Sequence, residues 1–290
     1  MTNGTLYYNR GCKCLVRLAV SAHTLRKHYD GPVTLLSQGD PSWGPCKEIA
    51  KRFGFGLKRV DFAETPDRKG ATYINATLCY KHVDYDATIW IDSDTIVCGD
   101  LAPLHELALE HDFVATQIAT WGSRHRSRVG KRIEHWRGIL PDDWLQASYD
   151  MDWGVNCGIF AFRRGSKFMR AWWRNAIKGQ HTRIPDEVCA QIMLGVYPHA
   201  KAPNAFNVSC KYGTPEHYAD ARIIHFHGNK HCRFGRDRKT KAITRDHTNH
   251  SDWWFPQFEE IRNWSLVQKS IRSDRMLRKY LPIWDEVKNA

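Results

Sequence analysis

The chain has 290 residues, of which 42% are hydrophobic and 26% charged, and its formal net charge is +12 at pH 7. This length and balance are typical of a globular protein with a full core, and they exclude a disordered or fibrous chain. No apolar stretch is long enough to span a bilayer, and no apolar run follows a basic start at Met1. We therefore expect a cytoplasmic protein without a signal peptide.

The first half of the sequence alternates short apolar segments with amphipathic ones. The predicted strands are Thr5–Tyr8, Val33–Leu36, Leu57–Phe62 and Ala87–Ile91, and the predicted helices between them are Leu15–His28, Pro45–Phe53 and Thr72–Val83. In residues 15–28 the apolar positions recur at i, i+3, i+4 and i+7, which is typical of one helix face. This alternation predicts an α/β fold, with a mostly parallel sheet flanked by helices.

The second half is less regular but continues the same pattern. We expect strands at Asp112–Ile118, Trp153–Phe162 and Arg222–Phe226, helices at Ser166–Lys178 and Asp186–Leu194, and a partly helical stretch at residues 121–137. From Trp253 onward the chain is rich in aromatic residues and is predicted to be helical. The sequence therefore predicts an α/β domain at residues 1–250 and a helical extension at residues 251–290 that packs on it.

The most informative feature is Asp92-Ser93-Asp94, which directly follows the apolar run Ala87–Ile91. Two Asp side chains at i and i+2 point to the same side of an extended backbone, so both can face one ion. Mn²⁺ and Mg²⁺ take such oxygen ligands and keep positions open for substrate phosphates. Most short Asp-x-Asp patterns are solvated turns, but two carboxylates that interrupt an apolar strand are costly to bury unless something is bound there. We expect a divalent-cation site at the carboxyl end of this strand, where ligands of doubly wound sheets bind.

The nine cysteines are scattered along the chain, and several lie inside apolar runs. An odd number of cysteines in such places indicates reduced, buried thiols rather than a disulfide framework. This agrees with the expected cytoplasmic location.

The positive charge is concentrated in three segments. Residues 222–245 hold eight Lys and Arg against one acidic residue, residues 122–137 hold six against one, and residues 163–174 hold five against none. Such patches favour a polyanionic partner such as DNA, because focused potential raises the local concentration of anions. Alternatively, part of the charge meets the phosphates of a small substrate and the rest serves solubility. Four tryptophans interleaved with the charge favour nucleic acid: Trp121, Trp136, Trp172 and Trp173.

Three further segments follow the Asp pair in a suggestive order. These are Asn156-Cys157-Gly158, then Asp186-Glu187, then Ile223–Lys230 with His225 inside it. Together with Asp92-Ser93-Asp94 and the following Gly99-Asp100-Leu101, the set resembles the glycogenin-like family of retaining glycosyltransferases (family 8), which have the GT-A fold. The resemblance covers most of residues 4–232, and its most specific part is the Asp-x-Asp segment with its Gly-Asp-Leu continuation.

The resemblance implies a role for each matching position. The two Asp residues would hold Mn²⁺ or Mg²⁺ against the diphosphate of a nucleotide sugar, with the late-strand His completing the metal shell. The predicted metal ligands are Asp92, Asp94 and His225; the predicted catalytic residues are Asn156, Asp186 and Glu187; the predicted donor-binding residues are Tyr8, Asn9, Asp92, Ser93, Gly228 and Lys230. The chain departs from the family pattern in the late segment, where Lys230 follows Gly228 by two positions rather than three.

The expected activity is the metal-dependent transfer of a sugar from a nucleotide sugar, expected to be a UDP-sugar, to a hydroxyl group. Retention of anomeric configuration is implied by the resemblance alone. Two acceptor classes stay open. One is a hydroxylated base in DNA, as in phage-type DNA modification, and the other is a saccharide or lipid-linked glycan.

Other classes of protein fit the same residues less well. A sugar-phosphate nucleotidyltransferase normally has a Gly-rich loop after its first strand, and Asn9-Arg10-Gly11 is poor in glycine. A non-catalytic nucleic-acid-binding protein leaves the Asp pair unexplained, because carboxylates without a cation repel phosphate. A zinc site is a further alternative, but the spacing of its possible ligands matches no common zinc pattern: His225, His227, His231 and Cys232. Asp186 and Glu187 can also be read as an ordinary acidic helix start, which the helix dipole favours.

Overall fold

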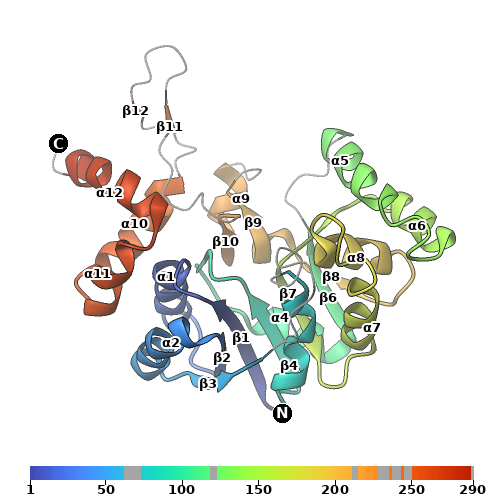
Figure 1. Cartoon of the computed structure of the whole chain (residues 1–290), viewed down its shortest axis with the longest axis horizontal. Coiled ribbons are helices and arrows are strands. Elements are labelled where there is room, and N and C mark those ends of the chain that lie inside the picture. Colours follow the sequence, from blue (N-terminus) through green and yellow to red (C-terminus); the bar gives the residue numbers. More distant parts are fainter. Residues whose placement is uncertain are drawn as a thin grey trace.

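The computed structural model describes residues 1–61, 73–117, 123–210, 215–227, 235–236, 243–244 and 250–288. Within these segments the central feature is a seven-stranded sheet of order β3-β2-β1-β4-β7-β6-β8 (Figure 1). Its strands are β1 (Asn3–Arg10), β2 (Val33–Gln38), β3 (Gly56–Arg59), β4 (Ala87–Ile91), β6 (Phe113–Gln117), β7 (Val155–Arg163) and β8 (Ala200–Lys201). Neighbouring strands are parallel except where β7 pairs antiparallel with β4 and β6. The predicted mostly parallel α/β sheet is confirmed.

Alternate residues of the central strands point to opposite faces of this sheet, so each strand contributes to two cores. On β4, for example, Ile89 and Ile91 belong to one buried cluster and Trp90 belongs to the other. The first cluster is covered by α1 (Leu15–Arg26), α2 (Asp40–Phe53) and α4 (Ala102–Glu110). The second is covered by η1 (Asn75–His82), α5 (Ser123–Glu134), α6 (Asp142–Tyr149), α7 (Lys167–Ala176) and α8 (Pro185–Leu194).

A second, three-stranded sheet extends the fold beyond the end of β4. It consists of β5 (Thr95–Val97), β10 (Ile223–His225) and β9 (Val208–Ser209), in the order β5-β10-β9, and η2 (Asn204–Asn207) leads into β9. In the antiparallel pairing of β10 with β5, His225 lies opposite Thr95. This register places a residue from the last third of the chain directly beside the Asp92-Ser93-Asp94 segment.

The remaining described elements lie late in the chain. They are the short helix α9 (Pro215–Ala219), the paired strands β11 (Gly235–Arg236) and β12 (Ile243–Thr244), and the helices α10 (His250–Ile261), α11 (Ser265–Ile271) and α12 (Arg275–Lys288). Helices α10 and α11 pack against α1 (Figure 1). Trp254, Phe255 and Phe258 are fully buried there, and the ring of Phe255 stacks on Trp284 at 4.7 Å. The predicted aromatic packing of this region is confirmed, and its division from residues 1–250 as a separate extension stays a proposal.

Two predicted helices differ from the structure. Helix α2 begins at Asp40, five residues before the predicted start, so Pro45 lies inside it. Pro45 has no N–H to donate to the carbonyl of Pro41, and that carbonyl accepts a hydrogen bond from Cys12 Sγ at 3.2 Å instead. The segment predicted as a helix from Thr72 is a 3-10 helix over Asn75–His82.

All eight cysteines within the described residues are free, and Cys232 lies outside them. Among the described helices, none combines the length and the apolar character that a bilayer span requires.

Candidate active site

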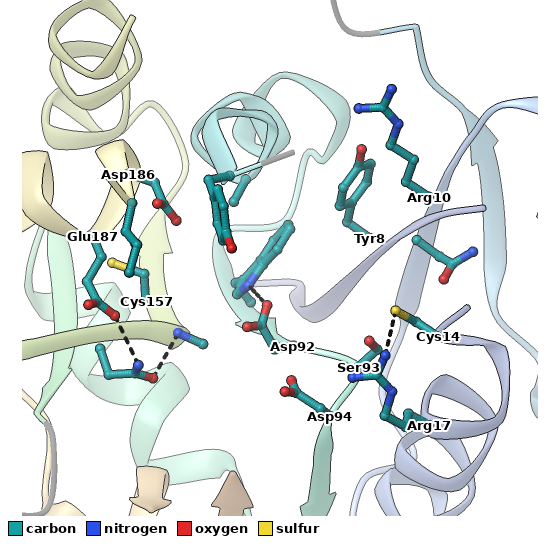
Figure 2. Close-up of a pocket in the computed structure, with 17 residues that line it drawn as sticks. Tyr8, Arg10, Cys14, Arg17, Asp92, Ser93, Asp94, Cys157, Asp186 and Glu187 are labelled. Atoms are coloured by element: carbon teal, nitrogen blue, oxygen red, sulfur yellow. Dashed lines mark hydrogen bonds between the residues drawn. The ribbon is translucent and has the colours of Figure 1, made fainter. Parts of the chain in front are cut away.

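A pocket of about 290 Å³ opens at the carboxyl ends of β1 and β4. The residues that line it lie between positions 8 and 187, and they include most of the predicted site: Tyr8, Asn9, Asp92, Ser93, Asp94, Asn156, Asp186 and Glu187. Figure 2 shows Asp92 and Asp94 in the middle, Asp186 and Glu187 on one side, and Tyr8, Arg10 and Arg17 on the other. The predicted donor-binding residues Gly228 and Lys230 lie outside the described residues.

The Asp pair lies in a tight turn between β4 and β5, and not on the extended backbone that the sequence predicted. The turn is fixed by its backbone and by one neighbour: Asp92 N donates to Gly158 O at 2.8 Å, and Trp90 Nε1 donates to Asp92 Oδ1 at 3.0 Å. The side chain of Asp94 is 10% exposed and that of Asp92 is 40% exposed. Despite the turn, both carboxylates face the same point.

His225 completes a cluster with the two aspartates. Its Nε2 lies 3.4 Å from Asp94 Oδ1 and 3.9 Å from Asp92 Oδ2, and one ligand atom from each residue falls within 4.8 Å of the others. The imidazole occupies space that Gly158 leaves free, because a Cβ at position 158 would lie 2.1 Å from His225 Cε1. The three predicted metal ligands are thus brought together by β4, β5, β7 and β10.

The cluster is electrostatically strained when no cation is present. Burial and then the charge of Asp94 raise the pKa of Asp92 to about 7, and His225 opposes the rise. Burial alone would lower the pKa of His225, but Asp94 and Asp92 raise it above its ordinary value. A divalent cation would displace these protons and relieve the repulsion between the carboxylates. Two carboxylates and one imidazole fit Mn²⁺ or Mg²⁺.

The opposite wall of the pocket carries the acidic pair at the start of α8. Asp186 is buried, and its Oδ1 has no hydrogen-bond partner among the described residues. Burial raises the pKa of both Asp186 and Glu187. The residue before Pro185, Ile184, has a φ of 53°, which costs a β-branched residue on the order of 1–3 kcal/mol. Trp172 Nε1 donates to Asp186 O at 2.9 Å and holds this strained start in place.

Glu187 contacts the predicted residue Asn156 and also a residue that the sequence did not single out, Arg132; Asn207, likewise not singled out, contacts Asn156. Asn156 Nδ2 donates to Glu187 Oε2 at 3.1 Å, and Arg132 Nη1 lies 3.3 Å from Glu187 Oε1. Asn207 Nδ2 donates to Asn156 Oδ1 at 3.0 Å. In the sequence, Arg132 is one of several basic residues at positions 121–137. Asn207 stands out only as a polar residue between Phe206 and Val208. Neither signal pointed to the pocket.

The side of the pocket near β1 is polar and positively charged. Asn9 Nδ2 donates to Gly11 O at 3.0 Å, and the Tyr8 hydroxyl accepts from Asn75 Nδ2 at 3.0 Å. Arg17, in the first turn of α1, is only 7% exposed and lines the pocket beside the Asp turn (Figure 2). A buried guanidinium at this position was not predicted, and it places a positive charge on this wall of the pocket.

The tryptophans proposed as a nucleic-acid surface have different environments. Trp136 and Trp172 are fully buried core residues, so for these two the expectation was wrong. Trp173 is partly exposed, with Lys81 Nζ 5.6 Å from its ring centroid, and Trp121 lies outside the described residues. The zinc alternative gains no support: the His227 ring stacks on His225 and its Nε2 lies 2.7 Å from Ser209 Oγ, while His231 and Cys232 lie outside the described residues.

The fold is similar to that of two solved glycosyltransferases. The galactosyltransferase LgtC, crystallised with donor and acceptor sugar analogues, has a TM-score of 0.55 and 16% identity, and the match covers 89% of this chain and 95% of LgtC. The glycosyltransferase GlyE of Streptococcus pneumoniae TIGR4 has a TM-score of 0.56 and 15% identity, over 92% of this chain and 64% of GlyE. This chain thus spans less than two thirds of GlyE.

At such low identity the likeness concerns the fold, and the chain has the GT-A fold that the sequence resemblance implied. No family model and no curated protein matches the sequence.

Proposed function

We propose that this protein is a metal-dependent glycosyltransferase that transfers a sugar from a nucleotide sugar, a UDP-sugar, to a hydroxyl acceptor with retention of configuration. The observation that carries the proposal is the convergence of Asp92, Asp94 and His225 beside a pocket on a GT-A fold. Two carboxylates that face one point repel each other unless a proton or a counter-charge is present, and a cation that also binds a diphosphate would supply the counter-charge. The two structural neighbours, both glycosyltransferases by name, support the same reaction class.

Each side of the pocket would then serve one part of the substrate. Asp92, Asp94 and His225 would hold the cation, whose charge would offset the negative charge that develops on the departing diphosphate. Arg17, Tyr8 and Asn9 would bind the nucleotide end from the β1 side, and Gly228 and Lys230 are proposed for the phosphates from the family resemblance. Glu187 faces the pocket from the other side, where its carboxylate would stabilise positive charge on the sugar ring.

Asn156 and Arg132 favour the ionised form of Glu187, since both lower its pKa against the rise that burial causes. Burial raises the pKa of Asp186 well above its ordinary value, which favours a proton on this carboxyl that could be donated to the sugar in a hydrogen bond. The surroundings of the two neighbouring carboxyl groups thus favour the protonated form of Asp186 more strongly than that of Glu187. This is the usual way in which one site assigns different roles to two acids.

The test is donor turnover by the purified protein with a panel of UDP-sugars and Mn²⁺. We expect slow release of UDP and free sugar without an acceptor, lost on adding EDTA and in Asp94→Asn. The matched control is Asp84→Asn, which makes the same chemical change at an exposed Asp that does not line the pocket. Formation of a nucleoside triphosphate from pyrophosphate would instead indicate a nucleotidyltransferase. If no donor is turned over, the protein would instead be a non-catalytic binding protein.

For the acceptor, one observation favours a polyanion such as DNA with hydroxylated bases. Lys58, Lys81, Arg170 and Arg174 are exposed side chains from β3, η1 and α7 that together form a basic face. The face is continuous: Lys58 Nζ donates to His82 O at 2.8 Å, and Arg170 and Arg174 both act on the pKa of Tyr80. No carboxylate within the described residues pairs with these four cations. A phosphate backbone would supply the missing counter-charges.

Charge reversal separates this acceptor from a glycan. Arg170→Glu with Arg174→Glu should weaken binding of a hydroxymethylated oligonucleotide and flatten its salt dependence by about two phosphate contacts, that is a slope change of about 1.8. Arg275→Glu with Arg278→Glu makes the same charge change on exposed residues of α12 and should matter less. Equal losses in both variants would indicate attraction by net charge alone. Stimulation of donor turnover by glycans and not by DNA would exclude the polyanion acceptor.

A further inference from the structure

The imidazole of His225 contacts Asn207 through Nδ1, the ring nitrogen that faces away from the two carboxylates. Asn207, the last residue of η2, is 2% exposed, and its Oδ1 lies 3.1 Å from His225 Nδ1. On the other side of the same amide, Nδ2 lies 2.8 Å from Thr116 Oγ1 and 3.0 Å from Asn156 Oδ1. Every polar atom of this side chain therefore has a partner.

The partners fix which way the Asn207 amide points. Thr116 Oγ1 donates its own proton to Ile159 O at 2.5 Å, so it can only accept from Asn207. Asn156 Oδ1 is an acceptor as well, since it accepts from Gly158 N at 3.1 Å while Asn156 Nδ2 donates to Glu187. Two acceptors require the NH₂ group between them. The amide oxygen must then face His225.

A carbonyl oxygen accepts and does not donate, so His225 Nδ1 must carry a hydrogen. The other ring nitrogen, Nε2, faces the two carboxylates at 3.4 and 3.9 Å. In the neutral ring only one nitrogen carries hydrogen, which leaves the lone pair of Nε2 directed at the point where the carboxylates converge. Ligating histidines are commonly oriented by such a hydrogen bond from the non-ligating nitrogen.

We propose that Asn207 is a positioning residue that sets the Nδ1–H tautomer of His225 and so prepares Nε2 as a ligand for a divalent cation. Because the same amide also binds Asn156, and Asn156 binds Glu187, it ties the metal side of the pocket to the acidic wall. This inference rests on one part of the proposed function, the binding of a divalent cation by Asp92, Asp94 and His225.

The first test is made on the wild-type protein. With ¹⁵N-labelled histidine and saturating Mg²⁺, which is diamagnetic, long-range proton–nitrogen correlations should identify a His225 ring protonated at Nδ1 and bare at Nε2. A ring protonated at Nε2 in the cation-bound protein would overturn the inference without any mutation.

The second test compares variants by Mn²⁺ affinity, measured by the EPR signal of free Mn²⁺. Asn207→Leu removes the acceptor at similar volume and should weaken binding about 10- to 100-fold, as losing such an orienting partner generally does. Asn207→Asp keeps an acceptor toward Nδ1 but loses the donor that faces Thr116 and Asn156, so it should weaken binding less than Asn207→Leu does. Ser209→Ala removes the equivalent partner of the neighbouring His227, 2.7 Å away, and should bind as wild type.

Circular dichroism and thermal melting establish that each variant is folded before its affinity is compared. Wild-type affinity in Asn207→Leu, or an equal loss in the folded Leu and Asp variants, would overturn the role of Asn207 while leaving the metal site intact. No Mn²⁺ binding by the wild-type protein would overturn the metal site itself, and the inference with it.

Discussion

Replacing Asp94 by Asn should make the stability of the metal-free protein less dependent on pH. Without a cation, the folded protein holds protons at the Asp92–Asp94–His225 cluster that the unfolded chain releases, because the pKa values of both Asp92 and His225 are raised. A folded state that binds more protons than the unfolded state loses stability as the pH rises. For Asp92 the loss runs from its ordinary value of 3.8 to about 7.

The magnitude follows from the size of that shift. Each pKa unit corresponds to about 1.4 kcal/mol, so the full shift of Asp92 sets a ceiling of about 4 kcal/mol. The Asp92 side chain is 40% exposed, and solvent screening reduces the effect to about 2 kcal/mol. Burial is the larger cause of the shift and the charge of Asp94 the second, so Asp94→Asn should remove somewhat less than half, about 1 kcal/mol.

The assay is urea unfolding in EDTA at pH 5 and pH 7.5, for wild type, Asp94→Asn and the exposed control Asp84→Asn. Other titrating groups cancel when the variants are compared at the same two pH values. Addition of Mn²⁺ at 100 times its Kd should stabilise the wild type by about 2.7 kcal/mol and should have little effect on Asp94→Asn. Parallel pH dependence in all three proteins, with no stabilisation by Mn²⁺, would refute the electrostatic account of the cluster.

Three further substitutions probe the geometry of the pocket. Gly158→Ala places a Cβ 2.1 Å from His225 Cε1, so Mn²⁺ affinity should fall at least about tenfold, whereas Gly44→Ala, with open space around its Cβ, should bind as wild type. Glu187→Gln should lower kcat for sugar transfer by about 10²-fold or more while Mn²⁺ affinity is kept, and a loss of affinity instead would place Glu187 at the metal. Arg132→Met removes a group that lowers the pKa of Glu187, so the acidic limb of the kcat/KM–pH profile should move to higher pH, and an unmoved limb would mean that Glu187 does not control it.

The sequence predicted the fold and the Asp pair of the candidate metal site because local patterns indicate both. Period and length identified the strands and helices of the sheet, and the carboxylates after β4 stood out against the apolar run before them. His225 was found only through the family resemblance, since a lone His on a strand is otherwise uninformative. Its place beside Asp94 depends on the antiparallel pairing of β10 with β5, which joins segments about 130 residues apart.

The sequence did not predict the features of the pocket that depend on tertiary contacts alone. Asn207 reaches Thr116 across 91 positions and Asn156 across 51, and no pattern near any of the three residues indicates these contacts. Trp136 and Trp172 lie among basic residues in the sequence, but both are fully buried: Trp172 on the inner face of α7, and Trp136 in the turn that follows α5. A charged segment and the aromatic residues within it can therefore face opposite directions, and composition does not distinguish them.

The central claim is that Asp92, Asp94 and His225 hold a divalent cation against the diphosphate of a nucleotide sugar. Its most direct test is a crystal soaked with Mn²⁺ and UDP, examined by anomalous diffraction. We predict an anomalous peak within coordinating distance of both carboxylates and of His225 Nε2, and also of the diphosphate oxygens. A nucleotide bound elsewhere, or a pocket with UDP but no Mn²⁺ at these three side chains, would contradict the account.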